Sequence, residues 1–188
     1  MMHTDAVTEA IRAVADAEIM PRFRSLADDE IIEKRPGDVV TVADRLAEQV
    51  LTAIFRQQDP GCLVVGEEGV YADAGPLKAL PSAELAWVID PVDGTRNFAN
   101  GSPDFAVMVA EVRRGVTTRS WICQPVHELM YYAELGAGVT RNGTGAGGGA
   151  VPTRGRGVAR PLRTPARGAG GRRPAGAAGR LLRGGLSL

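Results

Sequence analysis

Residues 87–98 read WVIDPVDGTRNF, and this stretch decides how the chain is interpreted. Three apolar residues run into Asp90, and Pro91 has no N–H to donate, so the pattern predicts a buried strand that ends at Asp90. Asp90 and Asp93 are then held close together on a turn, where like charges raise each other's pKa unless a cation lies between them. Mg²⁺ favours carboxylate oxygens together with water and substrate phosphate. The stretch therefore predicts a metal site that faces a phosphate.

The chain of 188 residues is long enough for one domain with a sizeable core. It contains no run of 18 or more apolar residues, so the sequence predicts no transmembrane helix. Residues 1–20 carry four acidic residues and lack the basic start and apolar core of a signal peptide. Cys62 and Cys123 are too few for a disulfide framework. These features predict a cytoplasmic protein with reduced thiols and no membrane contact.

The charges divide the chain into two parts. Residues 1–140 hold 12 basic and 22 acidic residues, a net charge of −10, whereas residues 141–188 carry +10. The second part is built from Gly, Ala, Arg and Pro and shows no helical or strand period. Such a composition cannot bury enough apolar surface to offset its chain entropy, so we expect a disordered tail.

The spacing of apolar residues predicts an α+β protein. Helices are expected over residues 4–20, with Thr4 as N-cap and Pro21 either bending or ending the helix, and from Asp44 to the turn at residues 59–61. Residues 69–84 are expected to form a loop with at most one helical turn, near Leu77, and glycines predict turns at 136–138 and 142–143. Strands are expected over residues 30–33, 39–42, 62–65, 86–89, 105–112, 117–123 and 128–134. Helices followed by a run of strands indicate helices packed on an antiparallel meander.

Three acidic clusters stand at the ends of these elements: Asp38 with Asp44, Glu67 with Glu68, and Asp90 with Asp93. Each has an ordinary explanation by itself. Charged residues after a strand usually lie in a solvated loop, an aspartate before an amphipathic segment is usually a helix cap, and Asp-Pro-x-Asp-Gly can be a simple turn. Their order and spacing together indicate a shared site.

These motifs resemble those of the inositol monophosphatase family, the Mg²⁺-dependent, lithium-sensitive sugar-phosphate phosphatases. The matching elements are Lys34, DVVTVAD at residues 38–44 with Glu48, VVGEE at 64–68, WVIDPVDGT at 87–95 and Asn97-Phe98, followed by Pro103 and residues 105–107, 136–138 and 142–143. The resemblance covers about residues 5–143. It implies the first half of the family's αβαβα sandwich, with the C-terminal α/β half missing.

The resemblance implies metal ligands residue by residue. Glu67, Asp90 and the backbone carbonyl of Val92 correspond to ligands of a first, activating Mg²⁺. The resemblance also implies that Asp90 and Asp93 would hold a second Mg²⁺. Two such cations would clamp the attacking and departing oxygens of a phosphate ester.

The resemblance also implies the catalytic residues. Asp44 and Thr95 correspond to the pair that orients and deprotonates the attacking water, with Glu67 taking part through the first metal. The backbone N–H groups of Gly94 and Thr95, beside Asp93, correspond to the phosphate-binding site. Free N–H groups at a helix start independently favour anions.

The family resemblance implies a phosphomonoester hydrolase that uses two-metal activation of water on inositol 1-phosphate or a related small alcohol phosphate. It also implies a possible homodimer. One departure is clear: the only tryptophans, Trp87 and Trp121, precede valine and isoleucine, so the family's Trp-Asp element is missing, and no acidic residue follows Glu134. A catalytically impaired, truncated fragment is therefore the alternative hypothesis.

The tail leaves three hypotheses open. It could be a basic arm that binds nucleic acid, a low-complexity extension, or the product of a frameshift in a GC-rich gene. The resemblance ends near Gly143, where the acid-free composition begins. This coincidence favours the frameshift over the nucleic-acid arm, and divides the chain into an incomplete family domain at 1–143 and a tail at 144–188.

Overall fold

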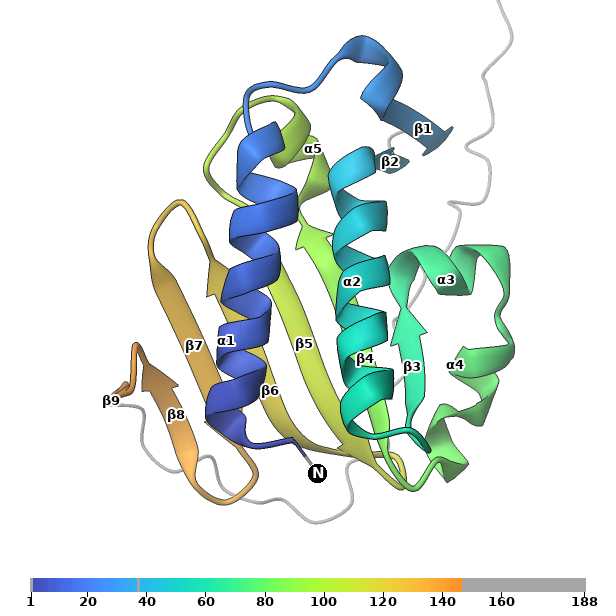
Figure 1. Ribbon diagram of the computed structural model, residues 1–188, viewed down its shortest axis with the longest axis vertical. Coiled ribbons are helices and arrows are strands. Elements are labelled where there is room, and N and C mark those ends of the chain that lie inside the picture. The colour runs from blue at the N-terminus through green and yellow to red at the C-terminus, as the bar shows by residue number, and fades with distance from the viewer. Residues whose placement is uncertain (1, 37, 147–188) are drawn as a thin grey trace, which may run out of the picture. The chain divides into compact units, whose positions relative to one another are not determined.

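A seven-stranded sheet carries two long helices on one of its faces in the computed structural model of this chain, which describes residues 2–36 and 38–146 (Figure 1). The helices are α1 (Thr4–Val14) and α2 (Val42–Gln58). The predicted α+β class, with helices packed on a mostly antiparallel sheet, is confirmed. In the described ranges, no helix has both the length and the apolar character that a membrane crossing requires. The expected tail at 144–188 lies almost wholly outside these residues.

The sheet follows the order of the chain. A short strand, β3 (Leu63–Gly66), pairs in parallel with β4 (Ala86–Asp93), and every later pair is antiparallel. The later strands are β5 (Ala106–Arg113), β6 (Val116–Gln124), β7 (Leu129–Glu134), β8 (Gly138–Arg141) and β9 (Thr144–Gly145). A separate hairpin joins β1 (Ile31–Arg35) to β2 (Asp38–Thr41). The expected meander is confirmed, whereas β8 and β9 were not predicted because short, exposed, glycine-flanked strands show no alternation.

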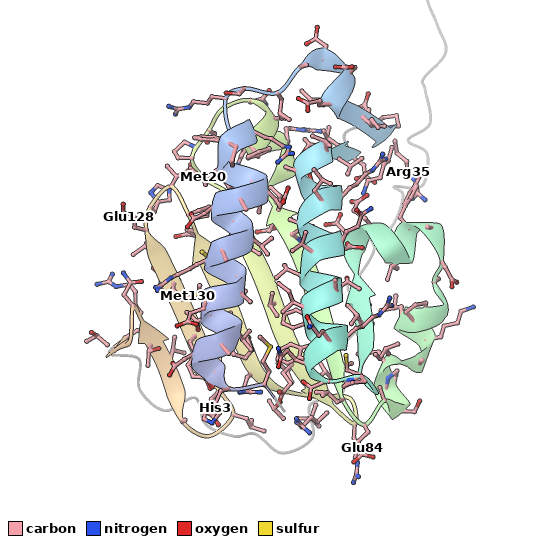
Figure 2. The ribbon with its side chains drawn as sticks, viewed as in Figure 1. His3, Met20, Arg35, Glu84, Glu128 and Met130 are labelled. Atoms are coloured by element: carbon pink, nitrogen blue, oxygen red, sulfur yellow. The ribbon has the colours of Figure 1, made fainter. Side chains whose placement is uncertain are left out.

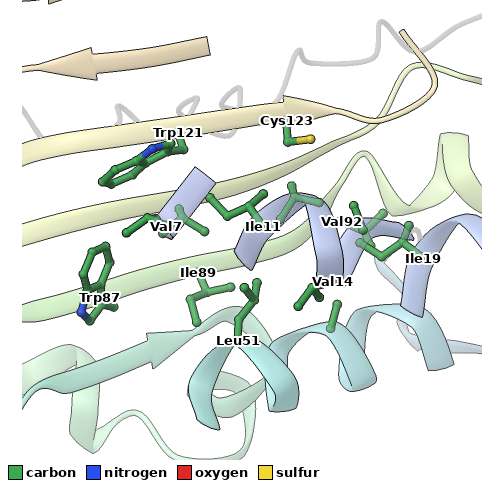
Figure 3. Packing of buried hydrophobic residues seen from close by; sticks show 14 of the residues in the cluster. Val7, Ile11, Val14, Ile19, Leu51, Trp87, Ile89, Val92, Trp121 and Cys123 are labelled. Atoms are coloured by element: carbon green, nitrogen blue, oxygen red, sulfur yellow. The ribbon is translucent and has the colours of Figure 1, made fainter. Parts of the chain in front are cut away.

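The core lies between the sheet and the two helices. The rings of Phe55 on α2 and Trp87 on β4 stack 4.4 Å apart, and Trp121 on β6 continues the cluster. Figure 3 shows Val7 and Ile11 of α1 between Trp121 and Trp87, in the same cluster. Each fully buried side chain of this size contributes about 1.5–3 kcal/mol. The packing therefore fixes both helices against the strands that bear the acidic clusters.

The first helix differs in detail from the prediction. Helix α1 ends at Val14, and the chain continues as a π-helical turn (Ala15–Ile19) and a 3₁₀ turn (Met20–Arg22) that contains Pro21. Thr4 is not the N-cap. That position belongs to His3, whose carbonyl accepts a hydrogen bond from Val7, while the Thr4 hydroxyl accepts one from Arg119. A contact with a distant strand therefore determines how Thr4 is used.

Pro91 does not end its strand as expected. Strand β4 runs on to Asp93, because a bulge between Asp90 and Asp93 places two residues opposite Val107 alone. A bulge lets the ladder resume after a residue that cannot donate, and it bends the strand locally. The two aspartates therefore lie at the end of one bulged strand rather than on a free turn.

The segment expected over residues 69–84 as a loop with at most one helical turn near Leu77 is more helical than expected, and α4 contains Leu77. It contains α3 (Glu67–Ala72), α4 (Gly75–Ala79) and a 3₁₀ turn (Leu80–Ser82). Helix α2 also begins at Val42, two residues before the expected start at Asp44, with Thr41 as its N-cap. Short helices of this kind depend on partners from elsewhere in the chain, which local periodicity does not reveal.

The sheet also contains a buried ion pair on its helix-covered face. Glu111 on β5 lies directly opposite Arg119 on β6, and their side chains are paired. Arg119 also donates to the carbonyl of Met2, and Arg113 and Thr118 donate to Glu111. This network ties the N-terminal segment to the middle of the sheet, at a distance from the acidic clusters.

Candidate metal and phosphate site

Three predicted acidic clusters meet at one end of the sheet. Strands β3 and β4 run in parallel, so Glu67 and Asp90 emerge at the same edge, beside the first turn of α2 and the start of α5 (Thr95–Ala99) (Figure 1). The charges of Glu67, Asp93 and Asp44 all act on Asp90. The fold therefore gathers four carboxylates contributed by residues 44–93 into one neighbourhood.

Asp44 and Thr95 are hydrogen-bonded to each other. The Thr95 hydroxyl lies 3.0 Å from Oδ1 of Asp44 and 2.8 Å from the Val92 carbonyl oxygen, so its single proton can serve either acceptor. Oδ2 of Asp44 accepts hydrogen bonds from the backbone N–H and the hydroxyl of Thr41, at 2.8 and 2.5 Å. Burial raises the pKa of Asp44, and these hydrogen bonds oppose the rise. The carboxylate is thus held rigidly with one oxygen toward Thr95.

The surroundings of Asp90 disfavour its ionised form. Burial, followed by the charges of Glu67 and Asp93, raises the pKa of Asp90 to about 7. Its Oδ1 atom is buried and has no hydrogen-bond partner among the described residues. A buried, unpartnered carboxylate oxygen among other carboxylates is costly. A hard divalent cation with oxygen ligands would remove that cost, so the chemistry of these donors fits Mg²⁺.

The convergence of the carboxylates is incomplete. Among residues 2–36 and 38–146, no three His, Cys, Asp or Glu side chains form a ready metal-holding group. The side chains of Glu67 and Asp93 are exposed. Glu67 lies 3.7 Å from the ammonium group of Lys34, which is also 2.8 Å from Glu68. The predicted ligands are therefore neighbours without a formed coordination shell.

Lys34 places its ammonium group beside these acidic side chains. Only 6% of its side chain is exposed, and its ammonium group also lies 3.7 Å from Asp38 and 5.2 Å from the centre of the Tyr71 ring. Burial opposes its charge, but the hydrogen bond to Glu68 and the nearby acids raise the pKa of Lys34 overall. Arg35 follows at the end of β1 nearest α3 and stands over the same Tyr71 ring (Figure 2).

Gly94 makes the sharp exit from β4 into α5. Its φ is +85°, and a Cβ there would lie 3.0 Å from the carbonyl oxygen of Asp104. Only glycine adopts this conformation without strain. Helix α5 begins at Thr95, as expected from the sequence, with Gly94 as its N-cap. The side-chain amide of Asn97 fixes the opposite loop by donating to the Asp104 carbonyl at 2.8 Å.

Sequence reasoning missed two features of this site. Thr41 holds Asp44 through a capping box, and the Thr-x-x-Asp spacing is a signal that could have identified it. Glu48 was noticed only as part of a motif, yet its carboxylate accepts the backbone N–H groups of Glu68 and Gly69. No local pattern predicts that contact, because it joins two separate helices.

The family comparison places these motifs in a known group. The model of the inositol monophosphatase family matches residues 2–165. The chain belongs to the inositol monophosphatase family. The resemblance indicated by the motifs is thereby confirmed, and the family match continues past Gly143, where the motifs stop, to residue 165.

Relatives in the inositol monophosphatase family are similar over about half of their own length. A Nus factor SuhB of Pseudomonas aeruginosa is 37% identical over 138 residues, which cover 71% of this chain and 49% of that protein. An inositol-1-monophosphatase of Rhizobium meliloti is 33% identical over 120 residues, covering 64% and 43%. The solved structure of a Thermotoga maritima IMPase superposes with a TM-score of 0.65 at 27% identity, covering 75% of this chain and 51% of that one. The observed fold thus corresponds to about half of a family structure.

Proposed function

We propose that this chain is a Mg²⁺-dependent phosphomonoester hydrolase acting on inositol 1-phosphate or a related small alcohol phosphate. The observation that carries the proposal is the buried, unpartnered Oδ1 of Asp90 beside the hydrogen-bonded pair of Asp44 and Thr95. Family membership supports phosphatase chemistry, and a relative is named inositol-1-monophosphatase.

In this proposal, Glu67, Asp90 and the Val92 carbonyl hold one Mg²⁺, and Asp90 and Asp93 hold a second. When bound, Mg²⁺ lowers the pKa of water and stabilises charge on phosphate oxygens. Each ligand is an oxygen atom at the same end of the sheet, and the crowding at Asp90 supplies the reason to bind a cation.

The chain's own residues then manage the proton. The Thr95 hydroxyl can donate to Oδ1 of Asp44 and accept a hydrogen bond from a water, so the water's proton can pass through Thr95 to Asp44. Thr41 keeps Asp44 in place during this transfer. The backbone N–H groups of Gly94 and Thr95 are proposed to receive phosphate oxygens, with Asp93 beside them.

The test is phosphate release from myo-inositol 1-phosphate by the full chain, with Mg²⁺ and with EDTA. We expect Mg²⁺-dependent release that falls at least about 100-fold in Asp90→Asn and in Thr95→Ala. Glu84→Gln is the matched control, because Glu84 is an exposed carboxylate at the opposite end of the sheet (Figure 2). No release by a folded chain would contradict the proposal and favour the impaired-fragment alternative.

That alternative has a specific basis. The chain spans about half the length of the curated relatives it matches, and no acidic residue follows Glu134 to supply a further carboxylate.

A cytoplasmic location and a homodimer remain part of the proposal, and the gel-filtration mass of the chain tests the dimer. The tail hypotheses concern residues outside the described part of the chain. Salt-dependent retention on DNA or RNA would favour the basic arm, which we do not expect.

A further inference from the structure

The start of helix α3 is held by a side chain that belongs to helix α2. One carboxylate oxygen of Glu48 accepts the backbone N–H of Glu68 at 2.8 Å, and the other accepts that of Gly69 at 2.9 Å. N–H groups in the first turn of a helix have no partner within the helix. The N-cap residue, Gly66, has no side chain with which to bind them. Glu48 therefore performs from a distance the capping that the local sequence does not provide.

Gly66 makes room for this contact. It is buried, its φ of −99° suits any residue, and a Cβ built there would overlap the carboxylate of Glu48. The reason for glycine is thus space and not backbone conformation. An alanine would fit the strand but would expel the end of a flexible side chain, leaving the fold intact and the contact broken.

The contact brackets Glu67 on both sides. Gly66 precedes Glu67 and packs against the Glu48 carboxylate. Glu68 follows Glu67, and its backbone N–H donates to the same Glu48 carboxylate. The backbone of Glu67 therefore cannot shift without breaking a charge-assisted hydrogen bond, which is about twice as strong as a neutral one. The side chain of Glu67 is itself exposed and lies 3.7 Å from the Lys34 ammonium group, so this backbone anchor is one of two restraints on its position.

Two carboxylates of helix α2 contact the starts of two other helices. Asp44 and Glu48 are four residues apart and so lie on one face of the helix. Asp44 binds Thr95 at the start of α5, and Glu48 binds the start of α3. One rigid helix thereby sets the separation between the backbone that carries Glu67 and the hydroxyl of Thr95.

We propose that Glu48 is a positioning residue that fixes Glu67 for divalent-cation binding, and that Gly66 provides the space for it. Glu48 touches neither the cation nor the substrate in this arrangement, and acts only through the backbone of α3. The inference rests on the proposed function, in which Glu67 is a ligand of the first Mg²⁺.

The experiment compares Glu48→Gln, Gly66→Ala and the double variant in the full chain. Gly61→Ala is the matched control, because a Cβ at Gly61 meets nothing within 4 Å. The first readout is amide hydrogen exchange of Glu68 and Gly69 without metal. The second is the Kd for Mn²⁺, used as the probe cation and measured by calorimetry. Both single variants should lose amide protection and weaken Mn²⁺ binding about 10-fold, as removal of an outer-shell partner commonly does.

The double variant distinguishes a shared contact from two separate defects. Because either change alone breaks the same contact, the double variant should bind Mn²⁺ no more weakly than the poorer single variant. Gly61→Ala should match the wild type in both readouts. Lost amide protection with an unchanged Kd would overturn the positioning role, and so would additive losses. A wild-type chain that binds no Mn²⁺ while its Glu68 and Gly69 amides are protected would instead overturn the proposed function, and the positioning role with it.

Discussion

Glu111 on β5 and Asp90 on β4 are carboxylates of one sheet placed in opposite electrostatic surroundings. Burial opposes the charge of both. At Glu111, hydrogen bonds from Arg119, Arg113 and Thr118 overcome it and lower the pKa to about 2. At Asp90, the neighbours are other carboxylates, and the pKa rises to about 7. The fold places Arg119 against Glu111, whereas the largest charge effects on Asp90 come from Glu67 and Asp93. A carboxylate with its own cation supports the structure, whereas one placed among like charges is available to an external cation.

The largest expected loss of folding stability comes from removing Arg119, the cation paired with Glu111. Arg119→Met leaves Glu111 buried with part of its partner set, and breaking such a pair typically costs about 3–5 kcal/mol. Urea denaturation followed by the fluorescence of the buried tryptophans measures the loss. Arg114→Gln is the control, since its ion pair with Glu84 is exposed and should contribute about 1 kcal/mol or less. Equal losses in the two variants would remove the contrast.

The pH dependence of stability tests the same region from the other side. Because the pKa of Glu111 is lower in the folded state, its contribution is fully present above about pH 4.5 and is lost as the pH falls from there towards about 2. The stability gap between the wild type and Glu111→Gln should therefore be wide at about pH 7 and narrow at about pH 3. Denaturation curves at both pH values provide the measurement. A gap that widens on acidification would contradict the assignment.

Removing the carboxylate of Asp90 should change the stability in the opposite direction. Asp90→Asn removes a carboxylate whose ionisation the folded state disfavours, so in EDTA at about pH 8 the variant should be more stable than the wild type. We expect a gain of about 1 kcal/mol, since Asp90 is only half-buried and solvent screens its neighbours. Adding Mg²⁺ should raise the melting temperature of the wild type alone. A destabilised variant in EDTA would show that Asp90 is a structural carboxylate like Glu111.

A similarly small effect is expected at Asp44, which is buried but held by neutral donors. Thr41→Val keeps the shape of the side chain and removes the hydroxyl that binds Asp44. The loss of this capping hydrogen bond should cost about 1 kcal/mol, well below the effect of Arg119→Met. Thermal unfolding of the two variants side by side measures the ratio. If Thr41→Val lost as much stability as Arg119→Met, Asp44 would be a structural carboxylate like Glu111.

Much of the fold could be predicted because it is written in local periodicity. The apolar spacing in residues 4–20 and 44–58 predicts the two helices, an apolar run predicts β5, and the two segments that follow it predict β6 and β7. The bulge at Pro91 could not be predicted, since it depends on how β4 pairs with β5. Helix α3 was missed for a similar reason: its first turn is completed by Glu48, 20 residues earlier.

The candidate site was predictable in its members but not in its supports. Asp44, Glu67, Asp90 and Asp93 belong to short motifs, and the structure brings them to one end of the sheet. Their supports come from other elements, and local sequence does not predict the contacts they make: Lys34 belongs to the family motifs, but its contact with Glu68 depends on how the β1 hairpin packs. The pairing of Glu111 with Arg119 was equally hidden, because in sequence both look like ordinary charged positions of a strand.

The stack of Phe55 on Trp87 has a consequence for the far end of α2. Phe55 is 11 residues from Asp44, about 16 Å along a helix that rises 1.5 Å per residue. If the helix tilted by about 5° about this stack, the Asp44 end would move by roughly 1.4 Å. Displacements of about 1 Å are enough to slow a reaction about 100-fold. Substitutions of Phe55 that leave the chain folded should therefore be felt as loss of alignment between Asp44 and Thr95.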